Sequence, residues 1–296
     1  MGPAGTLRTV GAYPFHLRGF TVTALADGKV LVYGTDPIGP HINLAKEAPT
    51  LRSQRGRPYS GAATDPVMWD PQQRGWEKIP LAPECSFQRF LHSATALPNG
   101  KVLIAGGLCD VPRSSNDNTP FTPHTQLSLW DGATKKWETA PSLTVGRLYH
   151  SASLMKDGSV VIVGGESDPI LGGAGEAVLN SVERFSEGGV EALAPLNIAR
   201  ARHTATALAD GSLLVTGGFD KDGKAMASVE HWDPAKQVWR AAPPLAIPRY
   251  NHSATLLTNG KVLIAGGSGV STAELYDPAA GTWSPTGAMS SPQARC

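Results

Sequence analysis

Residues able to do chemistry recur at one fixed distance from a repeated arginine. Four segments read Arg-x-x-His, and the residue two positions after each arginine changes its chemistry from segment to segment. These variable residues are Leu91, Tyr149, Arg202 and Asn251. A phenol, a guanidinium and a carboxamide supply hydrogen-bond donors, acceptors and a positive charge. Variation at one position of an otherwise regular array predicts a binding site.

A second group of chemically able side chains follows the glycine doublets of the sequence. Its members are Asp110, Glu166, Asp168, Phe219 and Asp220. We expect them to surround the variable residues and to add carboxylates and an aromatic ring to the predicted site. Solvated loop residues are the alternative interpretation of any single member, because carboxylates are mostly exposed in proteins.

The histidines raise the question of a metal. Four of them end the Arg-x-x-His segments, and a hydrogen bond repeated in every copy explains them without an ion. Ligands from separate copies would rarely converge within about 2.1 Å of one metal. Three others, His16, His41 and His124, lie outside the repeat and are candidate ligands for Cu, Zn or Fe. No spacing motif supports them, so the sequence requires no cofactor and leaves a bound metal as an alternative.

The elements that must position these residues form an internal repeat. Residues 92–107 return almost letter for letter as residues 252–267, looser copies span 150–165 and 203–218, and a degenerate copy spans 20–35. Each copy holds an Asn-Gly or Asp-Gly dipeptide between two short apolar runs. This pattern predicts five hairpins with two-residue type I′ turns, in which both central residues have positive φ.

Each copy therefore predicts four antiparallel strands. The first carries the histidine, the second ends in the glycine doublet, the third ends in an aromatic residue, and the fourth usually holds a tryptophan seven residues on. In the third copy Val190 replaces that tryptophan. We expect the tryptophans to pack between one four-stranded sheet and the next. A four-stranded sheet repeated about every 50 residues is typical of a β-propeller.

The chain resembles the kelch-repeat propellers, an architecture also found in the central domain of galactose oxidase. The glycine doublet, the paired aromatic residues and the leading arginine carry the resemblance over residues 7–283. The resemblance implies an all-β fold. It does not imply a copper-radical oxidase: Tyr149 stands at the register of the copper-binding tyrosine, but Leu91 stands where the cross-linked cysteine would be.

We expect a single propeller domain over residues 1–296. Its predicted repeats are 17–80, 89–141, 147–194, 200–243 and 249–287, preceded by an extra outer strand at 5–11. The ring is either five-bladed, or six-bladed with an incomplete last blade. The second plan leaves an unpaired edge, which favours self-association.

The connections between second and third strands vary in length while the others stay short. They all emerge on one face, where residues 36–66 and 108–126 form the longest loops. Because long loops in compact domains are usually functional, this face is the predicted binding surface. Cys85 and Cys109 also reach it. They either pair, which would favour an oxidising compartment, or remain thiols.

The amino-acid composition disfavours some classes of binding partner. The net charge of +1 gives no electrostatic footprint for nucleic acid or for an anionic membrane. No segment reaches the length of a membrane span, and Met1–Val10 has no signal-peptide core, so the compartment stays open. We expect a binding module for a partner protein or a small polar, carbohydrate-like ligand. The alternative is an enzyme on the same face, either a sugar isomerase or mutarotase or a metal-dependent oxidase.

Overall fold

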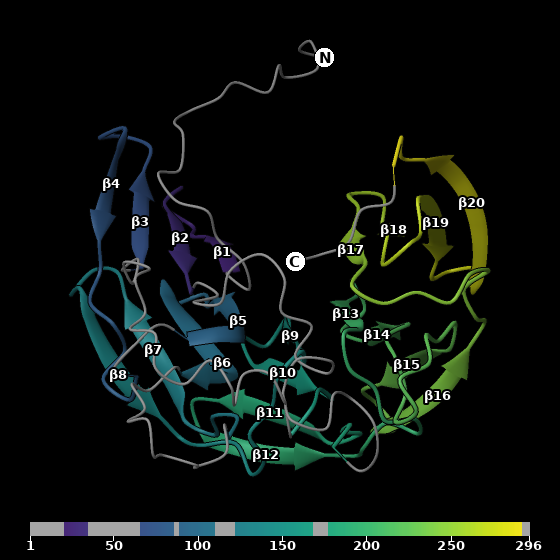
Figure 1. Cartoon of the computed structure of the whole chain (residues 1–296), viewed down its shortest axis with the longest axis horizontal. Coiled ribbons are helices and arrows are strands. Elements are labelled where there is room, and N and C mark those ends of the chain that lie inside the picture. Colours follow the sequence, from purple (N-terminus) through teal and green to yellow (C-terminus); the bar gives the residue numbers. More distant parts are fainter. Residues whose placement is uncertain (1–20, 35–65, 86–88, 110–121, 168–176, 292–296) are drawn as a thin grey trace, which may run out of the picture.

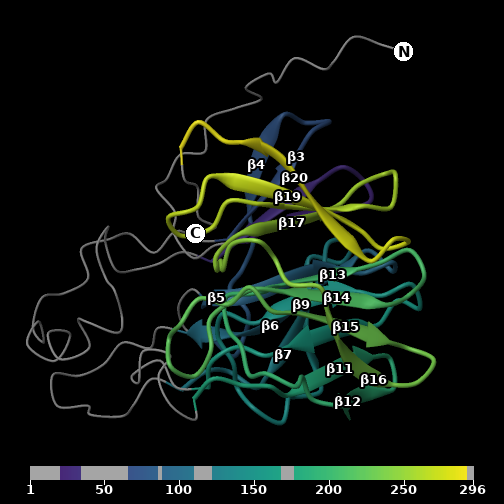
Figure 2. The same ribbon diagram turned by 90° about the vertical axis from the view of Figure 1, so that its right-hand side faces the viewer.

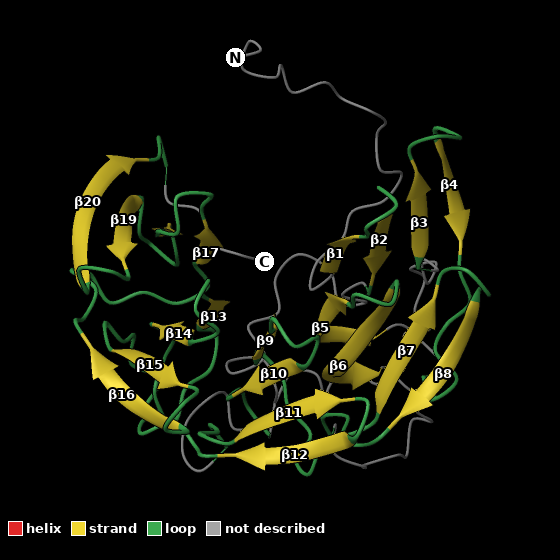
Figure 3. Ribbon diagram, turned by 180° about the vertical axis from the view of Figure 1, so that it is seen from behind, coloured by secondary structure: helices red, strands yellow, loops and turns green. Residues whose placement is uncertain are grey.

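The computed structural model describes residues 21–34, 66–85, 89–109, 122–167 and 177–291. Within these ranges the chain forms twenty β-strands and no helix, which confirms the all-β prediction (Figure 3). The strands group into five sheets of four antiparallel strands, and in each sheet the strands pair in sequence order. This part of the chain accordingly offers no helix long and apolar enough to cross a membrane.

The five sheets are the blades of a propeller. Blade 1 consists of β1 (Thr21–Ala24), β2 (Val30–Tyr33), β3 (Val67–Asp70) and β4 (Gly75–Lys78). Blade 2 consists of β5 (Arg89–Ala96), β6 (Lys101–Cys109), β7 (Leu127–Asp131) and β8 (Lys136–Ala140). Blade 3 consists of β9 (Ser151–Leu154), β10 (Val160–Val163), β11 (Val182–Ser186) and β12 (Gly189–Leu193). Blade 4 consists of β13 (Thr204–Ala207), β14 (Leu213–Thr216), β15 (Val229–Asp233) and β16 (Val238–Ala242). Blade 5 consists of β17 (Ser253–Leu256), β18 (Val262–Ala265), β19 (Thr272–Asp277) and β20 (Thr282–Ala288).

The blades stand around a common axis. Figure 1 shows the first strand of each blade toward the middle of the molecule and the fourth strand at its outer rim. Along the chain, the first strand of each blade lies beside the first strand of the next, from β1 and β5 through to β13 and β17. Blades 1 and 5 stand apart, so the five blades form an open arc (Figure 1). In the side view of Figure 2 the strands run roughly along one direction, and their ends gather on two opposite faces.

The hairpins between first and second strands are tight, but their turns differ from the predicted ones. In blade 1 the N–H of Gly28 donates to the carbonyl of Leu25 (3.0 Å), and the N–H of Leu25 donates to the carbonyl of Lys29 (2.8 Å). Gly28 has a positive φ of 85°, whereas Asp27 does not. The prediction of type I′ turns is therefore wrong: each loop has three residues, a type I turn followed by a left-handed glycine. The reason is local, because the Asp27 carboxylate accepts the Lys29 N–H (3.1 Å) and stabilises this turn.

Apolar side chains of neighbouring blades interdigitate to form the core. Between blades 3 and 4, Val161 and Val163 pack against Leu213 and Val215. All four side chains are at most 4% exposed. Fully burying a side chain of this size contributes about 1.5–3 kcal/mol. The same alternation builds one cluster at each of the four junctions, so the apolar core runs through the arc.

The predicted aromatic pairs form across the third and fourth strands. Their ring centroids lie 4.8–5.3 Å apart in the pairs Trp69–Trp76, Trp130–Trp137, Trp232–Trp239 and Tyr276–Trp283. In blade 3, Phe185 faces Val190 across the same two strands. The indole N–H of Trp239 donates to the carbonyl of Ala194, at the end of the preceding blade (2.8 Å). The tryptophans therefore join blades as well as strands, as the sequence predicts.

The leading arginine of each blade is the polar counterpart of this core. Arg200 is completely buried. Its guanidinium donates to the carbonyl of Gly217 (2.8 Å) and to the carboxylate of Glu230 (2.8 Å). Its own backbone carbonyl accepts the N–H of Gly165 from the preceding blade (2.9 Å). The other carboxylate oxygen of Glu230 accepts the N–H of Asn197, just before the arginine (2.8 Å). Arg200 and Glu230 thus join the segment that leads into the first strand, which we call the approach segment (residues 197–203 in blade 4), to two strands of the same blade. The Arg200 carbonyl also joins the preceding blade.

The same arrangement recurs in the other blades that carry the arginine. Arg147 pairs with Glu183, and Arg249 pairs with Glu274, with all four side chains at most 6% exposed. In blade 2 a serine replaces the strand glutamate. There Arg89 donates to Ser128 (3.1 Å) and pairs with Glu84 from outside the sheet (3.0 Å).

Removing one partner of a buried ion pair leaves the other charge uncompensated. We therefore expect Glu230→Ala to lower the free energy of unfolding by about 3–5 kcal/mol, measured by urea denaturation. Glu191→Ala is the matched control, because Glu191 pairs with Arg184 at an exposed site. Its expected cost is below about 1 kcal/mol. Equal losses in the two variants would contradict a structural role for the buried pair.

Candidate functional site

The four variable residues share a rare backbone conformation. Leu91, Tyr149, Arg202 and Asn251 have positive φ values of 57°, 50°, 54° and 54°. Non-glycine residues seldom adopt this region, and such strain gathers at functional sites. In blades 3, 4 and 5 these residues lie two positions before the first strand, whereas Leu91 of blade 2 lies within β5.

Backbone hydrogen bonds bring three of these residues together. The N–H of Arg202 donates to the carbonyl of Tyr149 (2.9 Å), and the N–H of Asn251 donates to the carbonyl of Arg202 (3.0 Å). Leu91 and Tyr149 both pack against one apolar cluster, formed by Phe90, Leu108 and Leu148. The predicted register is therefore a connected series that runs from blade 2 to blade 5.

The side chain of Arg202 lies between two aromatic rings. Its guanidinium carbon is 3.9 Å from the ring centroid of Tyr149 and 5.2 Å from that of Phe219. Phe219 in turn meets Tyr250 edge to face, with centroids 6.0 Å apart. Cation–π contacts of this kind contribute about 0.5–1 kcal/mol each when exposed and more when desolvated. The stacking fixes the direction of the guanidinium, while 28% of the Arg202 side chain stays exposed.

A buried carboxyl group completes the cluster. Glu166 follows the glycine doublet of blade 3 and is held by paired backbone hydrogen bonds with Leu148 (2.8 Å each). Its side chain is only 3% exposed, and its Oε1 lies 3.8 Å from Nε of Arg202. That distance is too long for a hydrogen bond. Neither atom has a hydrogen-bond partner among the described residues.

Burial changes the protonation of this carboxyl. Desolvation, opposed by the nearby charge of Arg202, raises the pKa of Glu166 from 4.5 to about 7. The group is therefore close to half ionised near neutral pH. We call Tyr149, Glu166, Arg202 and Phe219 the Arg202 cluster. It offers a partly exposed cation, an aromatic surface and a carboxyl group that can hold or release a proton.

The remaining predicted residues divide into two groups. Asp220 lies next to Phe219, but its carboxylate accepts the N–H groups of Asp222 (2.9 Å) and Lys224 (3.0 Å) and so shapes its own loop. Asp110, Asp168, His16 and His41 lie outside the described residues, as do the outer strand expected at 5–11 and most of loops 36–66 and 108–126. For these the sequence expectations stay predictions.

The repeated histidines serve the structure. The Nε2 atom of each lies 2.8–2.9 Å from a serine or threonine hydroxyl of the preceding blade. The four pairs are His92 with Thr21, His150 with Ser93, His203 with Ser151 and His252 with Thr204. Burial lowers the pKa of His92 to about 3, which keeps the ring neutral. The hydrogen bond that the sequence predicts for the repeated histidines is therefore present at all four of them.

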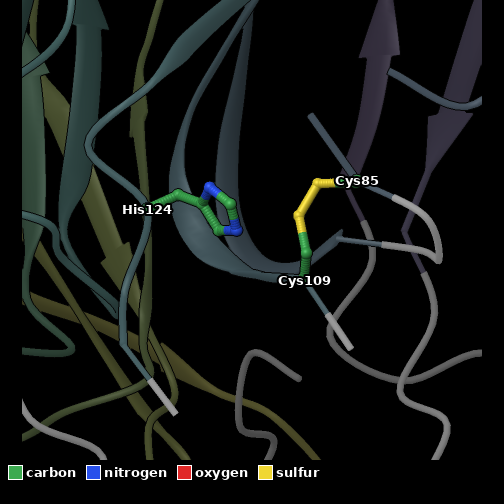
Figure 4. Close-up of side chains that lie close together, drawn as sticks. All are labelled: Cys85, Cys109 and His124. Carbon is green, nitrogen blue, oxygen red and sulfur yellow. A yellow bond between two sulfur atoms is a disulfide. The ribbon is translucent and has the colours of Figure 1, made fainter. Parts of the chain in front are cut away.

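His124, the candidate metal ligand that lies within the described residues, has different neighbours. Cys85 and Cys109 form a disulfide, with Cα atoms 5.5 Å apart, and the His124 ring lies beside it (Figure 4). The sequence predicts that the two cysteines and His124 reach the same face, but it does not predict that His124 lies beside the disulfide. It also missed the buried glutamates, although a Glu two residues before the third-strand aromatic of blades 3, 4 and 5 was a readable signal.

Comparisons with known proteins agree with this fold and repeat. The family model described as Kelch motif matches residues 199–246, which include blade 4. Kelch-like protein 33 from Homo sapiens is 28% identical over 160 residues, covering 54% of this chain and 27% of that protein. Beta-scruin from Limulus polyphemus is 32% identical over 107 residues, covering 35% of this chain and 11% of that protein. The matched regions therefore span about a quarter and about a tenth of these relatives.

The described residues therefore form a β-propeller of five blades that carries a Kelch motif over residues 199–246. The buried arginine, the glycine doublet and the aromatic pair recur in most of these blades.

The raised pKa of Glu166 predicts a pH effect on stability. Between its ordinary value of 4.5 and about 7, the folded protein keeps a proton that the unfolded chain releases. The free energy of unfolding should therefore fall as the pH rises through this window. Glu166→Gln removes this titration. The free energy of unfolding of the variant, relative to that of the wild type, should therefore increase by up to about 3 kcal/mol as the pH rises through the window.

Urea denaturation at a series of pH values measures this difference. Glu191→Gln, at an exposed site on β12, is the control and should follow the wild-type pH dependence. Identical pH dependence of the wild type and Glu166→Gln would show that Glu166 is not buried as described.

Proposed function

We propose that this propeller is a binding module that holds a partner protein through the Arg202 cluster and the face around it. The observation that carries the proposal is the partly exposed guanidinium of Arg202, which stacks on Tyr149 with the Glu166 carboxyl 3.8 Å away. Nε of Arg202 and Oε1 of Glu166 have no hydrogen-bond partner among the described residues, and an incoming polar group beside them would supply one explanation. The kelch-type relatives support a protein partner over other ligands.

The chemistry of the cluster indicates what the partner presents. A guanidinium held between aromatic rings is ready to donate hydrogen bonds to a carboxylate or a carbonyl without further ordering of its side chain. Arginine and tyrosine are also the residues that most often dominate protein interfaces. We expect an acidic or carbonyl-bearing loop of the partner to contact Arg202, with Tyr149 and Phe219 giving apolar contact beside it.

A small polar ligand is the alternative occupant of the same cluster. The rings of Tyr149 and Phe219 beside a cation and a carboxyl group also suit a carbohydrate-like molecule. An enzyme on this site is favoured by one observation, the Glu166 carboxyl whose pKa is about 7. Such a group can take up and return a proton near neutral pH, as an isomerase requires.

Affinity capture followed by titration tests the binding proposal. Immobilised wild-type chain is compared with the Tyr149→Ala, Arg202→Ala double variant, using extract of the cells that produce the protein. A recovered partner is then purified and titrated by calorimetry. We expect Arg202→Ala to weaken binding by about 2 kcal/mol, roughly 30-fold.

Lys236→Ala provides the matched control. Lys236 is exposed in the turn between β15 and β16, on the face opposite the ends of the glycine-doublet strands. Its substitution should leave the affinity within about twofold. A partner bound equally well by the wild type and both Arg202 variants would place the interface elsewhere.

Self-association would use other surfaces, the two flanks at which the described arc of blades ends. The side of a blade that faces the next blade along the chain is called its forward flank. The side that faces the preceding blade is called its rear flank. Ser151 and Ser153 on the forward flank of blade 3 are buried against blade 4. The equivalent residues of blade 5, Ser253 and Thr255, are exposed. On the rear flank of blade 1, Val22 is 60% exposed.

Every internal junction joins a forward flank to a rear flank. Among the described residues, one surface of each kind is therefore left without a neighbouring blade, and we propose that blade 5 of one copy packs on blade 1 of another. Heterologous contacts of this kind produce rings or filaments. The proposal predicts concentration-dependent association in sedimentation velocity experiments.

Val22→Lys and Thr255→Lys should each leave the chain almost entirely monomeric, with only traces of dimer. An equimolar mixture of the two variants should restore a dimer, because each variant keeps one intact flank. Thr139→Lys, on the outer strand β8, is the control and should associate like the wild type. A monomeric wild type, or a mixture that stays monomeric, would contradict head-to-tail packing.

A further inference from the structure

A cluster of metal-ligating side chains lies in blade 2, away from the Arg202 cluster. Cys85, Cys109 and His124 each offer one ligand atom, and these three atoms lie within 4.8 Å of one another. Figure 4 shows the imidazole of His124 beside the bond between the two sulfur atoms. The cysteines are 3% and 6% exposed, and His124 is half-buried.

Three separate chain segments converge there, and backbone hydrogen bonds fix each of them. Cys109 is the last residue of β6, where it pairs with Arg89 of β5. The N–H of Cys85 donates to the carbonyl of Ala82 in a tight turn (2.9 Å). The N–H of His124 donates to the carbonyl of Gly107, two residues before Cys109 (2.8 Å). The arrangement therefore does not depend on the disulfide alone.

Two thiolates and an imidazole are the ligand set that thiophilic and borderline cations prefer. We propose that the reduced Cys85 and Cys109, together with His124, bind a divalent cation of the zinc class, and that the disulfide is the closed form of this site. Such a set leaves the fourth tetrahedral position for solvent or an added ligand.

The protonation of His124 is compatible with this role. Burial, followed by the charge of Arg89, lowers the pKa of this imidazole, so the ring is neutral and its nitrogen is free to coordinate. The Arg89 charge is itself paired with Glu84 (3.0 Å). The geometry of the three ligand atoms, not this pKa, carries the proposal.

Exchange between the two forms is a two-electron step. In the forward direction hydrogen peroxide oxidises the metal-bound dithiolate: the two sulfur atoms lose one electron each and form the S–S bond. The O–O bond breaks, the peroxide takes both electrons and two protons to give two molecules of water, and the cation leaves with its charge unchanged. A dithiol reductant reverses the sulfur chemistry and opens the site again.

Cobalt titration of the full chain tests the site. The protein carries Cys296→Ser, so that Cys85 and Cys109 are its remaining cysteines. It is reduced with a phosphine, kept under argon and titrated with Co²⁺, whose thiolate charge-transfer and tetrahedral ligand-field bands report the ligands directly. We expect saturation at one Co²⁺ per chain, displacement of the bands by Zn²⁺ and their loss on addition of peroxide.

Variants separate a coordination site from adventitious binding. Cys85→Ser should abolish the charge-transfer bands, and His124→Ala should weaken Co²⁺ binding by about tenfold or more. His231→Ala is the control, because His231 lies in blade 4 with a serine hydroxyl as its neighbour (2.9 Å). Circular dichroism checks that each variant remains folded. The proposal would be overturned if the reduced protein showed no Co²⁺ bands. It would also be overturned if the oxidised protein or the Cys85→Ser variant bound Co²⁺ as tightly as the reduced protein does.

Discussion

The buried arginine at the start of a blade is the interaction on which the rest of the structure depends. In blade 4, Arg200 donates to the carbonyl of Gly217 just after the second strand, pairs with Glu230 on the third strand, and accepts the N–H of Gly165 from blade 3 at its own carbonyl. A completely buried guanidinium is costly unless its charge is paired and its donors are bonded, and here the Nη1 and Nη2 groups have partners while Nε does not. Its neighbours must therefore keep one arrangement, and the register of the strands follows from it.

This constraint explains why the glycine doublet is needed. A Cβ on Gly217 would clash with the carbonyl of Arg249 in the next blade, and one on Gly218 would stand 2.6 Å from the carbonyl of Ala201 in its own blade. Backbone therefore approaches both glycines too closely to leave room for a side chain. The polar contact, the glycine pair and the histidine hydrogen bond thus form one junction, which the chain repeats between blades. The apolar clusters add most of the burial, while the arginine junction defines the geometry.

The candidate site is a consequence of the same junction. Arg202 lies two residues beyond Arg200, and its left-handed conformation follows where the approach segment ends and β13 begins. Because both the arginine and the glycine doublet are anchored, the residues just after each of them meet: Arg202 beside Tyr149 and Phe219, and Glu166 beneath Arg202. A regular scaffold therefore presents irregular side chains, and the unsatisfied pair of Arg202 and Glu166 makes this place chemically distinct.

Much of this could be predicted from the sequence, because the repeat superimposes equivalent positions and separates regular from variable residues. The blades, the structural role of histidines such as His203 and the register of Tyr149 and Arg202 were accessible in that way. The turn at Asp27 and Gly28 was not, because type I and type I′ turns use similar residues. The burial of Glu166 and the meeting of His124 with Cys85 were not either, because they depend on contacts between distant segments that no local pattern encodes.

Amide hydrogen exchange in the native protein tests the central role of the arginine junction most directly. The N–H groups of Gly107, Gly165 and Gly218 donate to the arginine carbonyls of the following blades (2.8–2.9 Å). The account predicts that these three amides exchange only with global unfolding, as slowly as the central strands, although they lie at strand ends. Exchange of Gly165 and Gly218 as fast as that of Gly223, in an exposed loop, would contradict it.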